Sequence, residues 1–148
     1  KAPVPDEEFL IPFGQANVLR QGSDVTLIGT SSMVQICQSA AETLAREGIS
    51  AEVIDPRTIV PLDEATIVAS VCKTSRAVVV DEGHQNFGVT AEIAARISEK
   101  AFYHLDAPVQ RMGAMDVPIP FSPALEDLTV PTAEGVAARA RSLVMGEL

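Results

Sequence analysis

Residues 48–63 read GISAEVIDPRTIVPLD, and this run joins the end of one helix to a strand and then to the next helix. Gly48 is the type of residue that ends a helix, and the apolar residues that follow predict a buried strand at 51–55. Pro56 must end that strand, because proline has no N–H for a sheet ladder. Asp63 then opens an acidic helix start, which suits the positive end of a helix dipole. The run predicts one unit of a parallel α/β fold.

The same alternation of strand and helix continues on both sides of this joint. Apolar runs predict strands at 25–30, 76–81 and 108–112, and a short edge strand at 16–20. Apolar residues at three- and four-residue steps predict helices between Ser32 and Gly48, at 63–74, at 89–102 and from Thr132 onward. The pattern predicts an α/β three-layer sandwich (α/β/α), with a mainly parallel sheet of about five strands and one antiparallel edge strand.

Two local features sharpen this expectation. Ser32 and Gln35 match a capping box, in which both side chains bond to N–H groups at a helix start. Gly113 to Pro131 is predicted as one long irregular segment, and a loop of that length in a compact domain usually contacts something or serves a function.

Length and composition limit the class of protein. The 148 residues, 47% of them hydrophobic, suit one folded domain at 16–148, preceded by a linker at 1–15. The chain starts without a methionine, so we expect it to be a piece of a longer polypeptide. Its apolar runs are too short to span a membrane and no signal peptide is recognised, so we expect a cytoplasmic protein. The net charge of −9 argues against nucleic acids and anionic membranes as partners and favours a basic partner.

The cysteines and histidines point to no redox or metal chemistry. Cys37 and Cys72 fall inside predicted helices without a CxxC pair, so we expect two buried free thiols in a reducing compartment. The chain has two histidines without HxxxH spacing, so we expect no zinc site.

Polar residues follow every predicted strand of the parallel sheet, and such strand ends meet at one edge. The candidates for binding or interface roles at this rim are Arg57, Asp81, Glu82, His84 and Asp116. Three interpretations stay open: caps and turns, a binding edge, or a catalytic site. His84 suits an acid, a base or a ligand, and Arg57 suits a carboxylate partner across the rim or a structural role. No GxGxxG, GxxxxGK[ST] or GxSxG motif is present, so no reaction follows from the residues alone.

Several runs, in order, resemble the C-terminal domain of beta subunits of thiamine-dependent 2-oxo acid dehydrogenases. The run at 52–63 is similar to the family's EVIDLRTxxPLD pattern. The other matching runs are IPFGQA at 11–16, RQGSDVTL at 20–27, VVVDE at 78–82, AEIA at 91–94, LDAPV at 105–109 and DVPIPF at 116–121. The resemblance covers nearly the whole chain.

The resemblance implies a transketolase-like assembly domain in a decarboxylase built from two alpha and two beta subunits. Thiamine diphosphate and magnesium would bind on other domains, since the family's GDG…N motif is absent here, and no cofactor is expected on this chain. The implied further partner is the basic binding domain of a dihydrolipoyl acyltransferase. The carboxylate of Leu148 is a candidate contact with that domain if Leu148 is the native end.

The sequence departs from the family at two places. Pro56 replaces an apolar leucine, and residues 83–88 diverge, so the resemblance carries no role for His84. Residues 120–128 are most similar to acetoin-type enzymes, while pyruvate-type and branched-chain-type subunits stay open. Two other functions stay open as well: a small-ligand or regulatory module using the rim from Ser31 through Arg57 to His84, and a self-sufficient hydrolase.

Overall fold

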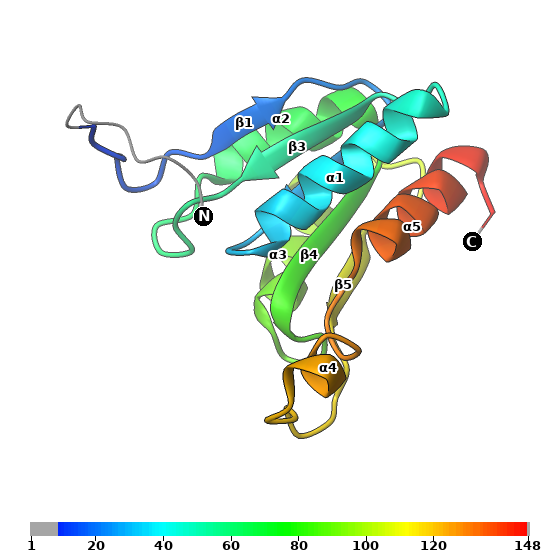
Figure 1. Cartoon of the computed structure of the whole chain (residues 1–148). Helices are drawn as coiled ribbons and strands as arrows, with labels where there is room; N and C mark the ends of the chain where they lie inside the picture. Colours follow the sequence, from blue (N-terminus) through cyan, green and yellow to red (C-terminus); the bar gives the residue numbers. More distant parts are fainter. Residues whose placement is uncertain (1–8, 148) are drawn as a thin grey trace.

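The computed structural model describes residues 9–147 and contains one five-stranded sheet between two layers of helices (Figure 1). The strands are β1 (Asn17–Arg20), β2 (Val25–Gly29), β3 (Ala51–Asp55), β4 (Ala77–His84) and β5 (Gln110–Ala114). The helices are α1 (Met33–Arg46), α2 (Glu64–Thr74), α3 (Val89–Ala101), the 3₁₀ turn η1 (Phe102–His104), α4 (Pro123–Glu126) and α5 (Ala133–Met145).

The strand order is β1-β3-β2-β4-β5. β1 runs antiparallel to β3, whereas the β2–β3, β2–β4 and β4–β5 pairs are parallel. The predicted α/β/α sandwich with one antiparallel edge strand is therefore confirmed.

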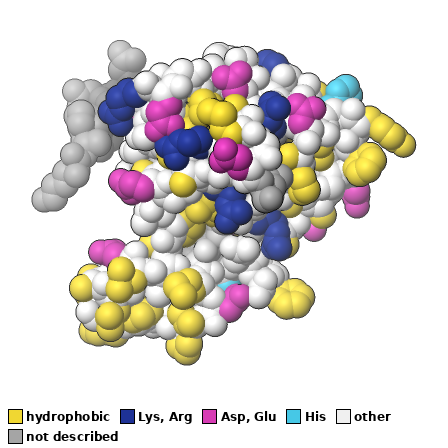
Figure 2. Space-filling model, turned by 90° about the vertical axis from the view of Figure 1, so that its right-hand side faces the viewer, with side chains coloured by type: hydrophobic (Ala, Val, Ile, Leu, Met, Phe, Trp, Pro, Cys, Tyr) yellow, Lys and Arg dark blue, Asp and Glu magenta, His cyan; other side chains and the backbone are white. Residues whose placement is uncertain are grey.

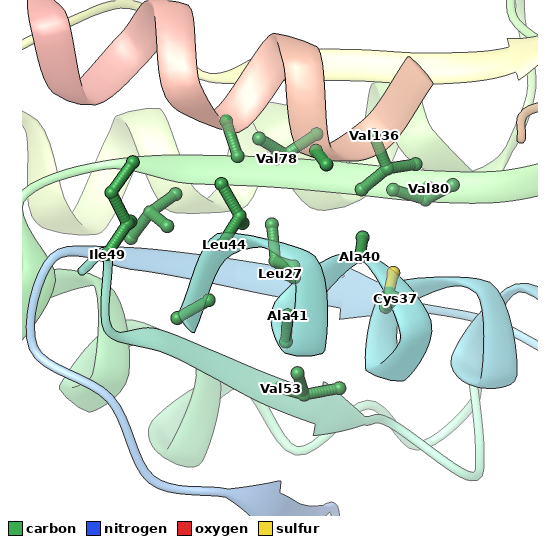
Figure 3. Close-up of a cluster of buried hydrophobic side chains, with 14 of the residues drawn as sticks. Leu27, Cys37, Ala40, Ala41, Leu44, Ile49, Val53, Val78, Val80 and Val136 are labelled. Atoms are coloured by element: carbon green, nitrogen blue, oxygen red, sulfur yellow. The ribbon is translucent and has the colours of Figure 1, made fainter. Parts of the chain in front are cut away.

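Each face of the sheet has its own apolar core, because successive side chains of a strand point to opposite faces. Leu27 and Val53 pack with α1 and α5, whereas Ile28 and Ile54 pack with α2 and α3. β2 is buried along its whole length, which explains why its sequence is an almost continuous apolar run. Figure 3 shows the first core, in which side chains of the sheet meet Cys37, Ala40, Ala41 and Leu44 of α1 and Val136 of α5.

Side-chain caps fix the starts of two helices. Asp63 accepts a hydrogen bond from the Thr66 N–H at 3.1 Å and so caps α2, and Thr132 accepts one from the Gly135 N–H at 3.1 Å and caps α5. The predicted capping box at Ser32 is wrong. Ser32 has a helical backbone (φ −63°, ψ −24°), whereas a capping side chain needs an extended one. Its hydroxyl donates instead to the carboxylate of Glu82.

The bounds of β4 and β5 differ from the predicted ones. β5 covers residues 110–114 rather than 108–112. β4 continues three residues beyond the predicted end at 81, because its tip at His84 pairs with Ala114 of β5 after an irregularity in the register. The predicted irregular segment contains a short helix, α4, so it is not irregular throughout. We call residues 115–128 the distal lobe; it lies beyond the ends of β4 and β5 (Figure 1).

The two cysteines, both expected to be buried, differ in exposure. Cys37 is buried, but Cys72 is only half-buried, because it lies at the margin of the core between the sheet and α2. The prediction of two buried thiols is therefore wrong for Cys72.

No helix within residues 9–147 combines the length and the apolar character needed to cross a bilayer.

Candidate functional site

The carboxyl ends of β2, β3 and β4 form a rim with a small hollow, which we call the rim pocket. Its volume is about 310 Å³, and it is lined by Thr30, Ser31, Asp55, Pro56, Arg57, Ile59, Asp81 and Val89. The pocket thus combines the polar ends of three strands with the first residue of α3.

The carboxylates of the rim pocket are already bonded to their own fold. Asp81 accepts hydrogen bonds from the Thr30 hydroxyl and, at 3.0 Å, from the Gly83 N–H. Asp55 accepts from the Arg57 N–H at 2.9 Å, and its other oxygen lies 3.8 Å from Arg57 Nε. Arg57 therefore does pair with a carboxylate, but with one two residues before it rather than with one on another strand.

Two residues of the rim pocket have an unusual backbone. Ser31 and Arg57 have φ values of 50° and 60°, in the left-handed region that non-glycine residues rarely adopt. Such conformations cost about 1 kcal/mol or more each and persist where the surrounding structure holds them, often at functional sites. At Arg57 the bond between its own N–H and Asp55 holds the turn.

The remaining candidates do not reach the rim pocket. Glu82 lies on the α1 side and is bonded to Ser32, whereas Asp81 bonds to Thr30 on the α3 side. This separation follows from the alternation of side chains along β4. Of the candidates, the rim pocket therefore contains Arg57 and Asp81.

Two further candidates attach the tip of β4 to the distal lobe. The Nε2 atom of His84 lies 3.1 Å from the Val117 carbonyl oxygen, and Asn86 donates to the carboxylate of Asp116. Leu148 lies outside the described residues. The candidates thus divide between the rim pocket, the α1 side and the lobe.

The residues with shifted pKa values serve the fold rather than a reaction. Burial raises the pKa of the Cys37 thiol to about 12, so it is not a thiolate nucleophile near neutral pH. Burial also raises the pKa of Asp63, but N–H groups of Ala16 and Thr66 and the Thr66 hydroxyl lower it overall. Within residues 9–147, no three His, Cys, Asp or Glu side chains are grouped closely enough to hold a metal ion.

The distal lobe has an exposed apolar surface that the sequence patterns did not predict. Phe87, in the loop between β4 and α3, is exposed. Six large apolar side chains of the distal lobe are exposed as well: Met115, Val117, Ile119, Phe121, Leu125 and Leu128. Phe121 is fully exposed. Figure 2 shows apolar side chains gathered over the lobe. The signal was present in the sequence, since apolar residues alternate with prolines at 117–121, but the pattern does not distinguish a buried from an exposed apolar side chain.

Comparison with known proteins agrees with this fold. The family described as "Transketolase, C-terminal domain" matches residues 14–136. The chain belongs to this family. Among curated relatives of this transketolase C-terminal domain, the Arabidopsis thaliana "Pyruvate dehydrogenase E1 component subunit beta-1, mitochondrial" is 52% identical over 131 residues, which are 88% of this chain and 36% of that protein.

A second relative, the "Acetoin:2,6-dichlorophenolindophenol oxidoreductase subunit beta" of Cupriavidus necator, is 43% identical over 97% of this chain and 42% of that protein. The transketolase C-terminal domain described here thus spans about two fifths of the length of these relatives. The predicted resemblance to dehydrogenase beta subunits is confirmed.

Solved structures show the same fold. A structure described as "Split gene transketolase, inactive beta4 tetramer" superimposes with a TM-score of 0.77 at 28% identity, over 100% of this chain and 46% of that one. A Pichia stipitis transketolase shares the fold with a TM-score of 0.62 at 21% identity, over 90% of this chain and 18% of that one.

Proposed function

We propose that the chain is the C-terminal assembly domain of the beta subunit of a thiamine-diphosphate-dependent 2-oxo acid dehydrogenase of the pyruvate or acetoin type. It supports oxidative decarboxylation and acyl transfer to lipoyl groups by holding subunits together, and catalyses no step itself. Its partners are an alpha subunit, a second beta subunit and the binding domain of a dihydrolipoyl acyltransferase, in the cytoplasm. Residues 1–15 are the linker from the preceding domain.

The cofactor belongs to other domains in this proposal. The family's GDG…N cofactor motif is absent from this sequence, so the proposal places thiamine diphosphate and magnesium on the other domains of the enzyme. No chemical step is therefore assigned to this chain.

The exposed distal lobe is the observation that carries the proposal. Large contiguous apolar patches are uncommon on monomers and mark interaction sites. Ile119 is 61% exposed, Leu128 is 73% exposed and Phe121 is fully exposed, so these side chains contribute little to the domain's own core. Their exposure is explained if another subunit covers them.

The test uses the full beta subunit, coexpressed with its alpha subunit. We expect Phe121→Asp combined with Ile119→Asp to weaken association of the subunits at least tenfold, measured by sedimentation at a series of concentrations. The control is Tyr103→Asp, because Tyr103 is 95% exposed in η1, outside the lobe. Unchanged association of the double variant, at an unchanged melting temperature, would refute the proposal.

A second candidate is a small-ligand or regulatory module at the rim pocket. The observation that favours it is the pair of left-handed residues, Ser31 and Arg57, that line one hollow. A screen of anions and nucleotides by thermal shift tests it, because a ligand at 100 times its Kd adds about 2.7 kcal/mol to stability. A screen without any shift would dismiss this candidate.

A further inference from the structure

β5 is the edge strand of the sheet on the side opposite β1. Among residues 9–147, β4 is the one strand that pairs with β5, and Gln110 to Gly113 are half-buried. An edge strand presents N–H and C=O groups that can pair with an added strand. In this domain the edge also borders a hollow of about 400 Å³, which we call the edge groove.

The edge groove has an arginine on each face of the sheet. Arg139 comes from α5, and its Nη1 donates to Gln110 Oε1 at 3.2 Å. Met112 packs on the same α5 side, so alternation along the strand places the side chain of Arg111 on the opposite face. There Arg111 Nη1 donates to the Gln85 carbonyl oxygen at 3.0 Å.

Neither guanidinium has a carboxylate partner among residues 9–147. The groove is lined by Gln85, Met115, residues 109–113, residues 128–131 and Arg139, and none of these is acidic. By contrast Arg57, Arg76, Arg96 and Arg141 all form ion pairs. Arg20 and Arg46 also form no ion pair within the described residues, so the distinguishing feature of Arg111 and Arg139 is that both line one hollow that contains no acidic residue. Guanidinium groups bind carboxylates through paired N–H donors, so the groove complements an acidic ligand.

An apolar hollow continues the edge groove along the α3 face. Its volume is about 800 Å³, and Val109 lines both hollows. Its walls are mostly small, aliphatic or aromatic residues of α3, η1 and the chain before β5, including Ala94, Ala95 and Phe102. One acidic residue, Asp106, also lines it and pairs with Arg76. A ligand lying along β5 can therefore place an apolar side chain here and acidic side chains beside the arginines.

We propose that the β5 edge binds an extended acidic peptide as an added strand. Two adjacent acidic residues of such a strand point to opposite faces, so one carboxylate meets Arg111 and the next meets Arg139. An apolar residue of the same peptide enters the hollow beside Val109. This site adjoins the subunit contact proposed for the distal lobe and shares Met115 and Leu128 with it.

The test measures binding of a fluorescein-labelled peptide, Leu-Thr-Glu-Glu-Val-Thr with an amidated end, by fluorescence anisotropy. We expect Arg111→Gln and Arg139→Gln each to raise the Kd at least fivefold, and a Gln-Gln version of the peptide to bind at least tenfold more weakly. The control is Arg46→Gln, since Arg46 ends α1, is exposed and forms no ion pair within the described residues. Melting temperatures show whether each variant is folded.

Three results would overturn the proposal. One is equal binding by the wild type and the Arg111→Gln/Arg139→Gln double variant, both folded. Another is full competition by citrate at the peptide's own concentration, which would make the site one for small anions. The third is self-association of the chain that the double variant abolishes, which would make the occupant a second copy. Amide shifts in nuclear magnetic resonance on adding peptide are expected along β5 and not along β1.

Discussion

The rim pocket and the distal lobe lie at the same end of the sheet, yet they use their side chains in opposite ways. At the rim, Asp55 and Asp81 accept hydrogen bonds from neighbouring residues of the same domain. In the lobe, Phe121 and Leu128 remain exposed and belong to neither core. The comparison shows that polar side chains at a strand end can have hydrogen-bond partners within their own domain, while apolar side chains at the same end of the sheet remain exposed. Substitutions at the two places should therefore affect different measurements.

The largest loss of stability is expected from a buried carboxylate that, like those at the rim, is bonded within the domain. Glu52 is 2% exposed, pairs with Lys73 and accepts a hydrogen bond from the Gly22 N–H at 3.2 Å. We expect Glu52→Gln to lower the free energy of unfolding by about 2 kcal/mol, because Lys73 and the Gly22 N–H lose their carboxylate partner. Urea unfolding at pH 7 measures this, with Glu42→Gln on the exposed side of α1 as the control. Equal stability of both variants would show that the Glu52 network contributes nothing.

The same carboxylate predicts a pH dependence. Burial raises the pKa of Glu52, but hydrogen bonds from Lys73, Ser70 and Gly22 lower it overall. Because the folded pKa lies below the unfolded value of about 4.3, this stability is present above that pH and is lost as the pH falls through the folded pKa. Urea unfolding between pH 7 and pH 3 should show a shallower acid loss in Glu52→Gln than in the wild type. Parallel curves would contradict the assignment.

The cap of α2 is expected to have the next largest effect. Asp63 accepts from the Thr66 N–H and, at 2.9 Å, from the Ala16 N–H, so it joins α2 to the residue before β1. We expect Asp63→Ala to cost about 1–2 kcal/mol and Asp63→Asn much less, since asparagine also caps helices. Thermal unfolding compares them. If both variants melt together, the cap is not the source of the loss.

At the rim itself the expected loss is smaller. Asp81→Asn keeps the shape of the side chain but weakens its hydrogen bonds with Thr30 and Gly83. We expect a loss of about 1 kcal/mol and no change in subunit association. Chemical unfolding and sedimentation of the same samples test both parts. Impaired association without any loss of stability would move the interface to the rim.

The smallest change in stability is expected in the lobe. Phe121→Ser removes a fully exposed ring, so the free energy of unfolding of the chain should change by no more than about 0.5 kcal/mol. Urea unfolding of the isolated chain measures it. A loss above about 2 kcal/mol would show that Phe121 packs within the domain, and the contrast with the rim would no longer hold.

Sequence patterns predicted the fold well where local chemistry decides the structure. Pro56 and Gly48 mark the ends of β3 and α1, and the strand at 25–30 is buried as expected. The tip of β4 was missed because its pairing with Ala114 of β5 depends on a distant segment rather than on local preference. Ser32 was misassigned because its bond to Glu82 joins residues fifty positions apart.

The candidate site was predicted less completely. Sequence order placed the polar residues at the rim, but the predicted strand ended at Asp81. The alternation that sends Asp81 and Glu82 to different sides applies because β4 continues to His84. Arg111 and Arg139 line one groove because α5 returns to the edge of the sheet beside β5. No local pattern contains that information.

Hydrogen–deuterium exchange of the beta subunit, free and assembled with its alpha subunit, tests the central claim most directly. If the distal lobe is a subunit contact, amides of residues 115–128 should exchange at least tenfold more slowly on assembly, while those of the rim at 55–58 change little. Unchanged exchange in the lobe, with assembly verified in the same samples, would contradict the account.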